Sequence, residues 1–274
     1  MIRGLYTAGI AMRMRMAEQD VVANNLANSN TVGYKGDKTI LKSFPEMLLH
    51  RLNTDLTKGP KGIIIDEAPV IGKISTGLEV NEVATDHSQG QLEFTDNPTD
   101  FALFGKGYFT VLTPEGEQYT RNGEFHLDKS GYLVTNQGYR VLGENGYIRL
   151  NEKNFAVRKD GSIVYNDQYT NTGANQYQNV RDLDKFKLRD FQFERGLKKV
   201  GENLYRETDL SGKPEKVVAG LEVKHSFIER PNFNIVKQMV EMINLQRAYE
   251  ASQKVVRTED DLLGAAINEV GRVA

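Results

Sequence analysis

The residue types that most often carry out catalysis or bind metals are few in this chain and are not spaced for either task. Its four histidines, His50, His87, His126 and His225, are scattered, and no two are separated by three or four positions. One helical turn therefore cannot bring two imidazoles to a zinc ion, and no zinc or catalytic-histidine site is indicated. The chain also lacks cysteine, which excludes disulfides, thiol nucleophiles and thiolate metal ligands together.

Other familiar motifs are incomplete. The glycine, lysine and glycine at 105–107 begin like a phosphate-binding loop, but the third glycine of GxGxxG is missing, so we expect a tight turn before Tyr108. Neither GxxxxGK[ST] nor GxSxG occurs. Acidic pairs such as Asp96 and Asp100 are more typical of turns and caps than of acid–base catalysis. The sequence therefore predicts no enzyme, no cofactor and no metal site.

A group of aromatic residues in the middle of the chain has two interpretations. These rings would line a sugar-binding face, or they would form the core and the cross-strand pairs of a β-sheet, which is the role we expect. The group comprises Tyr108, Phe109, Tyr119, Phe125, Tyr132, Tyr139 and Tyr147.

Bulk composition is that of a globular protein without an electrostatic partner. Of its 274 residues, 39% are hydrophobic and 26% are charged, with a formal net charge of -2, so we expect no nucleic-acid binding. The absence of cysteine fits either chance or a thiol-oxidising compartment. The arginine-bearing N-terminus lacks a long apolar run and a small-residue cleavage site, and no stretch is long and apolar enough for a membrane span. We therefore expect neither a cleaved signal peptide nor membrane insertion.

Both ends of the chain have helical periodicity. Near the N-terminus, apolar or small residues recur with the i, i+3/i+4, i+7 spacing of one helical face. These are Leu5, Ala8, Gly9, Met12, Met16, Val22, Ala23 and Leu26. Near the C-terminus a 4-3 seam runs through Ile235, Met239, Met242, Tyr249, Val256, Leu263, Ile267 and Val270. This second helix would span roughly 40 residues, about 60 Å, which exceeds the diameter of one compact domain. Part of its apolar face should therefore pack on the N-terminal helix or on another chain, in a coiled-coil-like core.

The middle of the chain is patterned as β-structure. Short apolar or alternating runs are separated by Gly-containing turns between about residues 71 and 230. The sequence thus predicts a mainly β protein with long terminal α-helices and a discontinuous β domain inserted between them. We expect an N-terminal helix over 1–30, an irregular connector over 31–70, a β-rich body over 71–230 and a C-terminal helix over 231–274.

Three segments resemble one known family. ANNLANSNTVGYK, residues 23–35, resembles the N-terminal signature of the bacterial flagellar axial proteins, which are the rod and hook components. The segment over 96–143 is similar to the shared core of that family, and the segment over 228–263 is similar to its C-terminal signature. The three motifs occur in the family's order and cover most of the chain. Its length resembles that of the proximal or distal rod proteins, including their Gram-positive relatives.

This resemblance implies a structural function. A rod subunit would polymerise through its terminal helices into a rigid tubular drive shaft that carries torque from motor to hook. Its partners would be other copies of itself, further rod and hook proteins, and the gate of the flagellar type III export apparatus. It would lie in the basal body, crossing the cell envelope, after export without a cleaved signal. The alternative is an adhesin-like β protein on the cell surface with a coiled-coil stalk; a wall hydrolase has less support, because no catalytic cluster is evident.

The resemblance also assigns two sets of site residues. The expected polymerisation interface comprises Leu5, Met12, Asn24, Asn25, Leu26, Asn28, Ile235, Met239, Met242, Tyr249, Val256 and Leu263. Within it, the asparagines would bridge neighbouring subunits without adding charge, or would cap the helix within one chain. In early rod and hook subunits a Phe-x-x-x-apolar element contacts the export gate, and Phe44 with Leu48 matches it. The alternative for this pair is a hydrophobic anchor of the connector.

Overall fold

The computed structural model describes residues 2–50, 57–58, 64–65, 70–75, 77–150, 155–166, 180–216 and 220–270. The chain divides into two compact units. The first unit contains residues 1–24, 37–84 and 236–274, and the second contains 25–36 and 85–235. Each unit is thus assembled from segments that are distant in the sequence.

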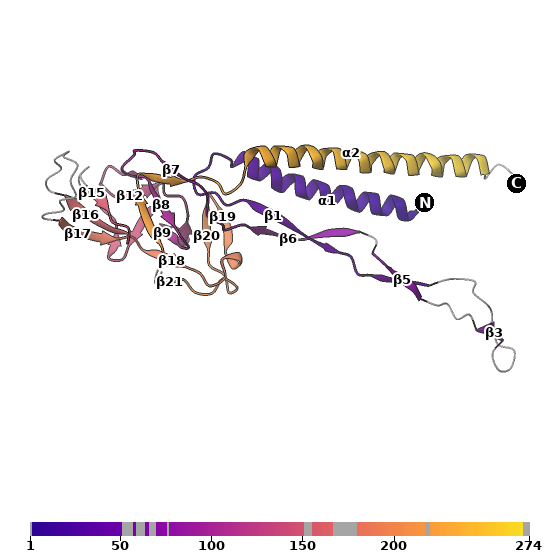
Figure 1. Ribbon diagram of the computed structural model, residues 1–274, viewed down its shortest axis with the longest axis horizontal. Coiled ribbons are helices and arrows are strands. Elements are labelled where there is room, and N and C mark those ends of the chain that lie inside the picture. Colours follow the sequence, from indigo (N-terminus) through magenta and orange to yellow (C-terminus); the bar gives the residue numbers. More distant parts are fainter. Residues whose placement is uncertain are drawn as a thin grey trace. The chain divides into compact units, whose positions relative to one another are not determined.

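The first unit contains the two helices and a β-ribbon. Helix α1 runs over Ile2–Ala27, and α2 runs over Ile235–Ala265 and continues as a π-helix over Ala266–Val270. The two helices lie side by side (Figure 1). A Cβ atom built on Gly4 of α1 would lie 2.5 Å from Oε1 of Glu259 in α2, so this glycine permits the approach. Neither helix that the structure describes is long and apolar enough to cross a membrane.

The ribbon takes the place of much of the expected irregular connector. Strand β1 (Asp37–Ser43) pairs with β6 (Leu78–Thr85), and β2 (Met47–His50) pairs with β5 (Val70–Ile74) in antiparallel fashion. A short pair of β3 (Thr57–Lys58) and β4 (Ile64–Ile65) follows between them. The rest of the predicted connector, at 51–56, 59–63 and 66–69, lies outside the described residues.

The second unit is built on a ten-stranded sheet. Its central path runs β11-β12-β13-β9-β10-β20-β19. The strands are β9 (Tyr108–Thr113), β10 (Gly116–Thr120), β11 (Phe125–Leu127), β12 (Leu133–Thr135), β13 (Arg140–Gly143), β19 (Lys198–Gly201) and β20 (Leu204–Arg206). Three more strands extend it: β14 (Gly146–Tyr147) on β13, β18 (Leu188–Asp190) on β9, and β21 (Glu215–Lys216) on β18.

Smaller sheets and one 3-10 turn complete this unit. Strands β15 (Phe155–Val157), β16 (Ser162–Asn166) and β17 (Val180–Lys185) form a three-stranded sheet. Strand β22 (Glu222–His225) pairs with β8 (Phe101–Phe104), and β23 (Phe227–Glu229) pairs with β7 (Leu92–Phe94). The 3-10 helix covers Glu194–Gly196. The β-rich body inserted between two helices is therefore confirmed in outline.

Strand β9 shows how this sheet forms its core. It is buried on both faces, so alternate side chains enter two different hydrophobic clusters. Phe109 and Val111 belong to the larger cluster with Phe101 and Phe125, while Tyr108 belongs to a smaller one with Phe191, Tyr119, Leu197 and Tyr205. A central strand covered on both faces is expected to be apolar over its length.

Candidate functional site at the junction of the chain segments

The asparagine-rich segment ends α1 and then enters the β body. Backbone bonds from Asn28 N to Asn25 O, 3.1 Å, and from Thr31 N to Asn28 O, 3.1 Å, turn the chain after the helix. The side chain of Asn25 is 2% exposed, and its Oδ1 accepts a hydrogen bond from the Tyr34 hydroxyl at 3.4 Å. Asn28 Oδ1 accepts one from the Thr31 hydroxyl at 3.3 Å. Asn25 and Asn28 therefore make local contacts within one chain.

Gly33 allows the following residues to pass close to the body. Its φ is +69°, which L-residues with a side chain seldom adopt. A Cβ atom built there would lie 2.5 Å from the backbone carbon of Arg121. The Gly33 amide donates to the carbonyl of Glu229 at 2.7 Å, so the N-terminal segment is fixed to the strand that precedes α2.

A buried ionic cluster lies at this point, and it consists of Lys35, Glu229 and Arg121. Lys35 Nζ is 2.6 Å from Glu229 Oε1, and Arg121 Nη1 is 3.6 Å from Glu229 Oε2. All three side chains are at most 3% exposed. Because an unpaired charge is very costly in such surroundings, the three groups depend on one another.

Backbone groups add hydrogen bonds to these charges, while Arg121 Nε, Arg121 Nη1 and Glu229 Oε2 are buried without one among the described residues. Lys35 Nζ also donates to the carbonyl of Ser88 at 2.7 Å, and Glu229 Oε1 accepts from the Gly90 amide at 2.8 Å. Arg121 Nη2 donates to the carbonyl of Gly105 at 2.8 Å. Its guanidinium carbon lies 5.1 Å from the centre of the Tyr108 ring, in cation–π contact. The cluster thus connects three distant parts of the sequence.

Burial and neighbouring cations shift the pKa values of the groups around the cluster. Burial lowers the pKa of Lys35, and the ion pair with Glu229 opposes this shift. Burial, followed by the positive charges of Lys35, Lys199 and Arg121, lowers the pKa of His87 to about 4. The imidazole of His87 is therefore neutral at pH 7, and its Nδ1 is 2.8 Å from the Tyr108 hydroxyl.

Asn232 fixes the chain just before α2. Its Oδ1 accepts from the Gly36 amide at 2.9 Å, and its Nδ2 donates to the carbonyl of Asp86 at 2.7 Å. The neighbouring Phe233 ring meets the Tyr34 ring edge to face at 6.1 Å between centroids. The end of the N-terminal signature and the start of the C-terminal signature are therefore held together inside the second unit.

This arrangement holds separate chain segments together. Its charged groups are enclosed, and Lys35 and Arg121 both face Glu229. Among the described residues no group of three or more histidine or acidic side chains is arranged to hold a metal ion. We name the group of Lys35, Arg121 and Glu229 the junction cluster.

The motifs discounted as catalytic have structural roles. Gly105 and Gly107 have φ values of +112° and +144° and form the turn before β9, as expected. Asp100 accepts hydrogen bonds from the side chains of Thr95, 2.7 Å, and Asn97, 2.9 Å, in a turn, which confirms its predicted role. Of the aromatic group, Tyr108, Phe109, Tyr119 and Phe125 are core residues, whereas Tyr132 and Tyr139 are half-buried and Tyr147 is exposed.

The predicted interface residues of α1 differ in exposure. Leu5, Met12, Leu26 and Asn28 are half-buried and Asn24 is exposed. Asn25 is enclosed by its own chain, so its side chain is not on the surface of this structure. The buried apolar residues of α1 are Ala8, Met14 and Val22.

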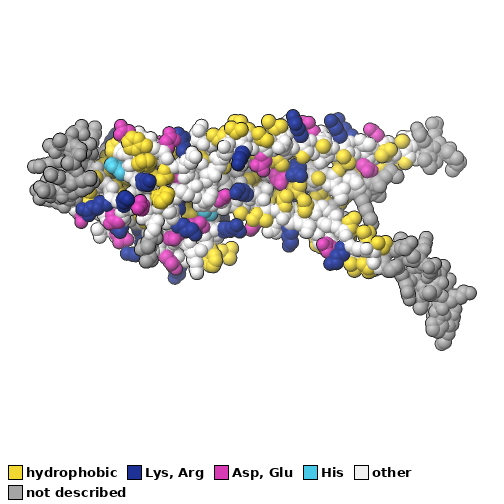
Figure 2. All heavy atoms as spheres, viewed as in Figure 1, with side chains coloured by type: hydrophobic (Ala, Val, Ile, Leu, Met, Phe, Trp, Pro, Cys, Tyr) yellow, Lys and Arg dark blue, Asp and Glu magenta, His cyan; other side chains and the backbone are white. Residues whose placement is uncertain are grey.

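On α2 the predicted interface residues lie beside a wider apolar surface. Met242, Tyr249, Val256 and Leu263 are half-buried, whereas Ile235 and Met239 are exposed. The exposed apolar set on the first turns also includes Val236, 67% exposed, Val240, 52%, and Ile243, 50%. Figure 2 shows hydrophobic side chains gathered over the beginning of this helix. Leu245 is the buried residue of α2.

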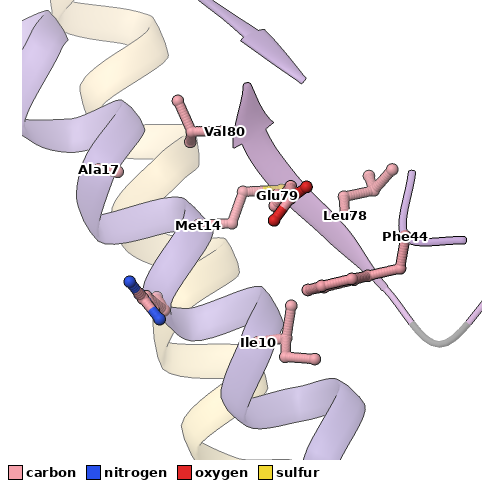
Figure 3. A pocket seen from close by; sticks show the side chains of 8 residues that line it. Ile10, Met14, Ala17, Phe44, Leu78, Glu79 and Val80 are labelled. Atoms are coloured by element: carbon pink, nitrogen blue, oxygen red, sulfur yellow. The ribbon is translucent and has the colours of Figure 1, made fainter. Parts of the chain in front are cut away.

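Phe44 and Leu48 are placed differently from each other. Phe44 is half-buried and lines a cleft of about 240 Å³ with Ile10 and Met14 of α1 and Leu78 of β6. Figure 3 shows the Phe44 ring directed toward the helix across this cleft. The Phe44 amide donates to the Gly77 carbonyl at 3.0 Å. Leu48 is 55% exposed on β2.

Sequence reasoning missed the junction cluster. Lys35 and Glu229 are 194 positions apart, so no local periodicity indicates that they pair. A weak signal was present, because Lys35 ends the N-terminal signature and Glu229 stands at the start of the C-terminal one. Arg121 lies within the middle family-like segment, over 96–143.

Comparison with known families gives three matches along the chain. Residues 5–35 match the family described as flagella basal body rod protein, and residues 102–165 match the D1 domain of the flagellar hook protein FlgE/F/G. Residues 224–269 match the C-terminal part of the flagellar basal body rod FlgEFG protein. The first and third matches contain the two segments that the junction cluster connects.

Similar proteins align over nearly the whole chain. The flagellar basal-body rod protein FlgG of Buchnera aphidicola subsp. Baizongia pistaciae is 35% identical over 268 residues, covering 96% of this chain and 98% of that protein. FlgG of Bacillus subtilis is 31% identical, with 98% and 99% covered. The flagellar hook-basal body complex protein FlhO of the same organism is 29% identical, with both chains fully covered.

Proposed function

The chain belongs to the family of flagellar basal-body rod proteins, and from this premise we propose that α1 and α2 polymerise it into the wall of a rigid tube that transmits torque. As a structural rod subunit it has its place in the flagellar basal body. Its partners are further copies of itself and other rod and hook components. The adhesin-like alternative is set aside, because the matched family is a rod family.

The observation that carries this proposal is the apolar surface on α2. Val236, Val240 and Ile243 recur at i, i+4 and i+7, and each is at least 50% exposed in the single chain. Such a stripe is stable in water only when another surface covers it. A neighbouring subunit in a tube supplies that surface, because every copy presents the same helix.

We assign the predicted interface to this contact. Ile235 and Met239 extend the exposed stripe, and Met242, Tyr249, Val256 and Leu263 follow it along the helix. On α1, Leu5, Met12, Leu26, Asn24 and Asn28 are accessible enough to contact a neighbour. Asn25 contributes indirectly, through its hydrogen bond with Tyr34. Long helices packed side by side in a coiled-coil-like manner resist twisting, since sliding would unpack many close contacts at once.

Substitutions on the exposed stripe test the polymerisation proposal. The double variant Val240→Asp with Ile243→Asp places charges where an apolar neighbour is expected, while leaving the β body unchanged. Expressed in a strain without the native gene, it should give a secreted and folded protein but no rods by electron microscopy of purified basal bodies. The control Glu241→Lys changes the charge by the same two units at an exposed position on another side of the helix, and it should assemble normally. Normal rods from the double variant would refute this interface.

For delivery we propose export through the flagellar type III apparatus, with Phe44 and Leu48 contacting the export gate. The exposure of Leu48 supports this assignment, and Phe44 is accessible to the gate when the chain is unfolded. Replacing both residues with serine should abolish secretion, measured as the amount of this protein outside the cell. The matched control is Met47→Ser, because Met47 lies on the same strand as Leu48 and is 52% exposed. Unchanged secretion of the double variant would remove the gate contact and leave the structural function standing.

A further inference from the structure

A cluster of arginine and tyrosine side chains, three of them exposed, lies around β13 and β14 of the ten-stranded sheet. The guanidinium carbon of Arg140 lies 4.7 Å from the centre of the Tyr132 ring and 5.1 Å from that of Tyr147. The guanidinium carbon of Arg149 lies 5.7 Å from the Tyr132 ring centre. The two rings meet edge to face at 6.2 Å. We call these four residues the Arg-Tyr surface.

The geometry of this surface favours a partner with carboxylates. Arg140, Arg149 and Tyr147 are exposed, and within the part of the chain that the structure describes neither arginine forms an ion pair. Cation–π contacts hold the guanidinium planes, and Arg149 Nε also donates to the carbonyl of Ser130 at 3.1 Å. Pre-oriented guanidinium groups bind carboxylates through paired hydrogen bonds, at a reduced entropy cost.

A turn of complementary chemistry follows β20. Leu210 is 79% exposed, and it is flanked by the exposed carboxylates of Glu207 and Asp209. Neither carboxylate forms an ion pair among the described residues. The turn is held firmly, because Ser211 is fully buried and its Oγ accepts from the Thr208 amide at 2.9 Å. We call residues 207–210 the acidic turn.

The sheet order separates these two surfaces. Of the Arg-Tyr surface, Arg140 is on β13 and Tyr147 on β14, and Tyr132 and Arg149 face each other in an isolated bridge, whereas the acidic turn follows β20. Between β13 and β20 lie β9 and β10, so the two surfaces stand about three strand spacings, roughly 15 Å, apart across the sheet. The arginines of the Arg-Tyr surface therefore cannot form ion pairs with the carboxylates of the acidic turn in the same chain.

We propose that the Arg-Tyr surface of one copy binds the acidic turn of the next copy. The guanidinium groups of Arg140 and Arg149 receive the carboxylates of Glu207 and Asp209, and Leu210 packs against the exposed ring of Tyr147. Because the two surfaces differ, the contact is head to tail, and each copy keeps one surface open to bind a further copy, as growth of a rod requires. This inference rests on the proposed function, and it adds a second contact, between β bodies, to the one between helices.

Cysteine crosslinking tests the pairing directly, since the chain has no native cysteine. Full-length protein carrying both Tyr147→Cys and Leu210→Cys, assembled into rods in cells without the native gene, is oxidised and run on a non-reducing gel. We expect a ladder of covalent oligomers at least tenfold more intense than for either single variant. A control pair, Phe94→Cys with Leu210→Cys, replaces another exposed aromatic residue, on β7 outside the ten-stranded sheet, and should give no ladder.

The outcomes separate this inference from the function on which it rests. Intact rods without a ladder, or with dimers alone, would overturn the head-to-tail contact and leave the rod function standing. If the double-cysteine protein does not assemble, variants that exchange the charges of the two surfaces test the pairing instead. Arg140→Glu and Asp209→Arg should each reduce the number of rods per cell at least fivefold, and the two together should restore it. Failure of the double variant to restore assembly would also overturn the pairing.

Discussion

At the scale of single residues, Glu229 is the member of the junction cluster on which the other two depend. Its two oxygens face Lys35 Nζ at 2.6 Å and Arg121 Nη1 at 3.6 Å. A buried ion pair adds little net stability compared with apolar packing, yet removal of one partner leaves an uncompensated charge. The cluster therefore enforces a specific arrangement of three chain segments more than it adds to the total stability.

The first prediction concerns Glu229→Gln, which keeps the shape and removes the charge. Two buried cations then lose their counter-ion, so the free energy of unfolding should fall by about 3 to 5 kcal/mol. Urea unfolding of the purified chain measures this change. The matched control is Asp182→Asn, which breaks an exposed pair with Arg158 at 3.1 Å and should cost at most about 1 kcal/mol. Equal losses of unfolding free energy in the two variants would show that the buried ion pair matters no more for stability than the exposed one.

The second prediction follows from the low pKa of His87, which is about 4 in the fold against 6.5 ordinarily. Between pH 4 and 6.5, His87 binds a proton in the unfolded chain but not in the native chain. The contribution of His87 to the free energy of unfolding is therefore fully present above pH 6.5 and declines as the pH falls toward 4. The loss has an upper limit of about 3.5 kcal/mol, because the pKa differs by about 2.5 units and each unit corresponds to about 1.4 kcal/mol.

Two variants isolate this contribution. His87→Gln should flatten the dependence of the unfolding free energy on pH between 4 and 6.5, whereas His126→Gln, at an exposed position, should leave it unchanged. The measurement is a series of urea unfolding curves at half-unit pH intervals. The same slope in His87→Gln as in the unchanged protein would exclude His87 as its source.

At the scale of elements, Gly33 decides how the chain leaves α1. Replacement by alanine should destabilise the protein in two ways, through its φ of +69° and through contact with the Arg121 backbone at 2.5 Å. Gly138→Ala separates these effects, since Gly138 has a φ of +87° but no neighbour within 4 Å. We expect about 1 to 2 kcal/mol for Gly138→Ala and clearly more for Gly33→Ala, from thermal unfolding. A smaller loss at Gly33 than at Gly138 would contradict the close approach.

Most elements could be predicted from local patterns, and the exceptions have physical causes. The helices showed a 3.6-residue period, and the strands of the body lie between Gly turns. Strand β1, in the expected irregular connector, was missed because it buries neither face well and its sequence has no period-2 alternation, whereas its partner β6 lies within the predicted β-rich stretch. On α1 the expected face included Met16, which is 52% exposed, whereas Met14 is buried. Met14 and Met16 are two positions apart and lie on nearly opposite sides of the helix, and the sequence does not distinguish between them where apolar residues occur on several sides.

The site was less predictable than the fold. The asparagines drew attention to the correct segment, but the partners of that segment are fixed by long-range topology. Arg121, Ser88 and Glu229 come from different strands or loops, and only the folded body brings them to Lys35. Single-sequence periodicity contains no information on such pairings, and the family resemblance indicated the segments without the contacts between them.

At the scale of the whole molecule, folding and polymerisation should be coupled. The exposed apolar stripe stabilises α2 only weakly in the single chain, because side chains that remain in water do not offset the conformational entropy lost when the helix is ordered. In the purified monomer, amide hydrogen exchange should therefore be faster over 235–265 than over the buried strand β9, and the difference should shrink in assembled rods. Equal protection of both regions in the monomer would show that α2 is stable without neighbours.

The most direct test of the central claim is an in-frame deletion of the gene, scored by electron microscopy of purified hook-basal bodies and by swimming. A structural rod subunit predicts a non-motile strain with truncated rods, and restoration of both properties by the intact gene. The position at which assembly stops would also locate the subunit along the rod. Full-length rods and normal swimming in the deletion strain would contradict the account.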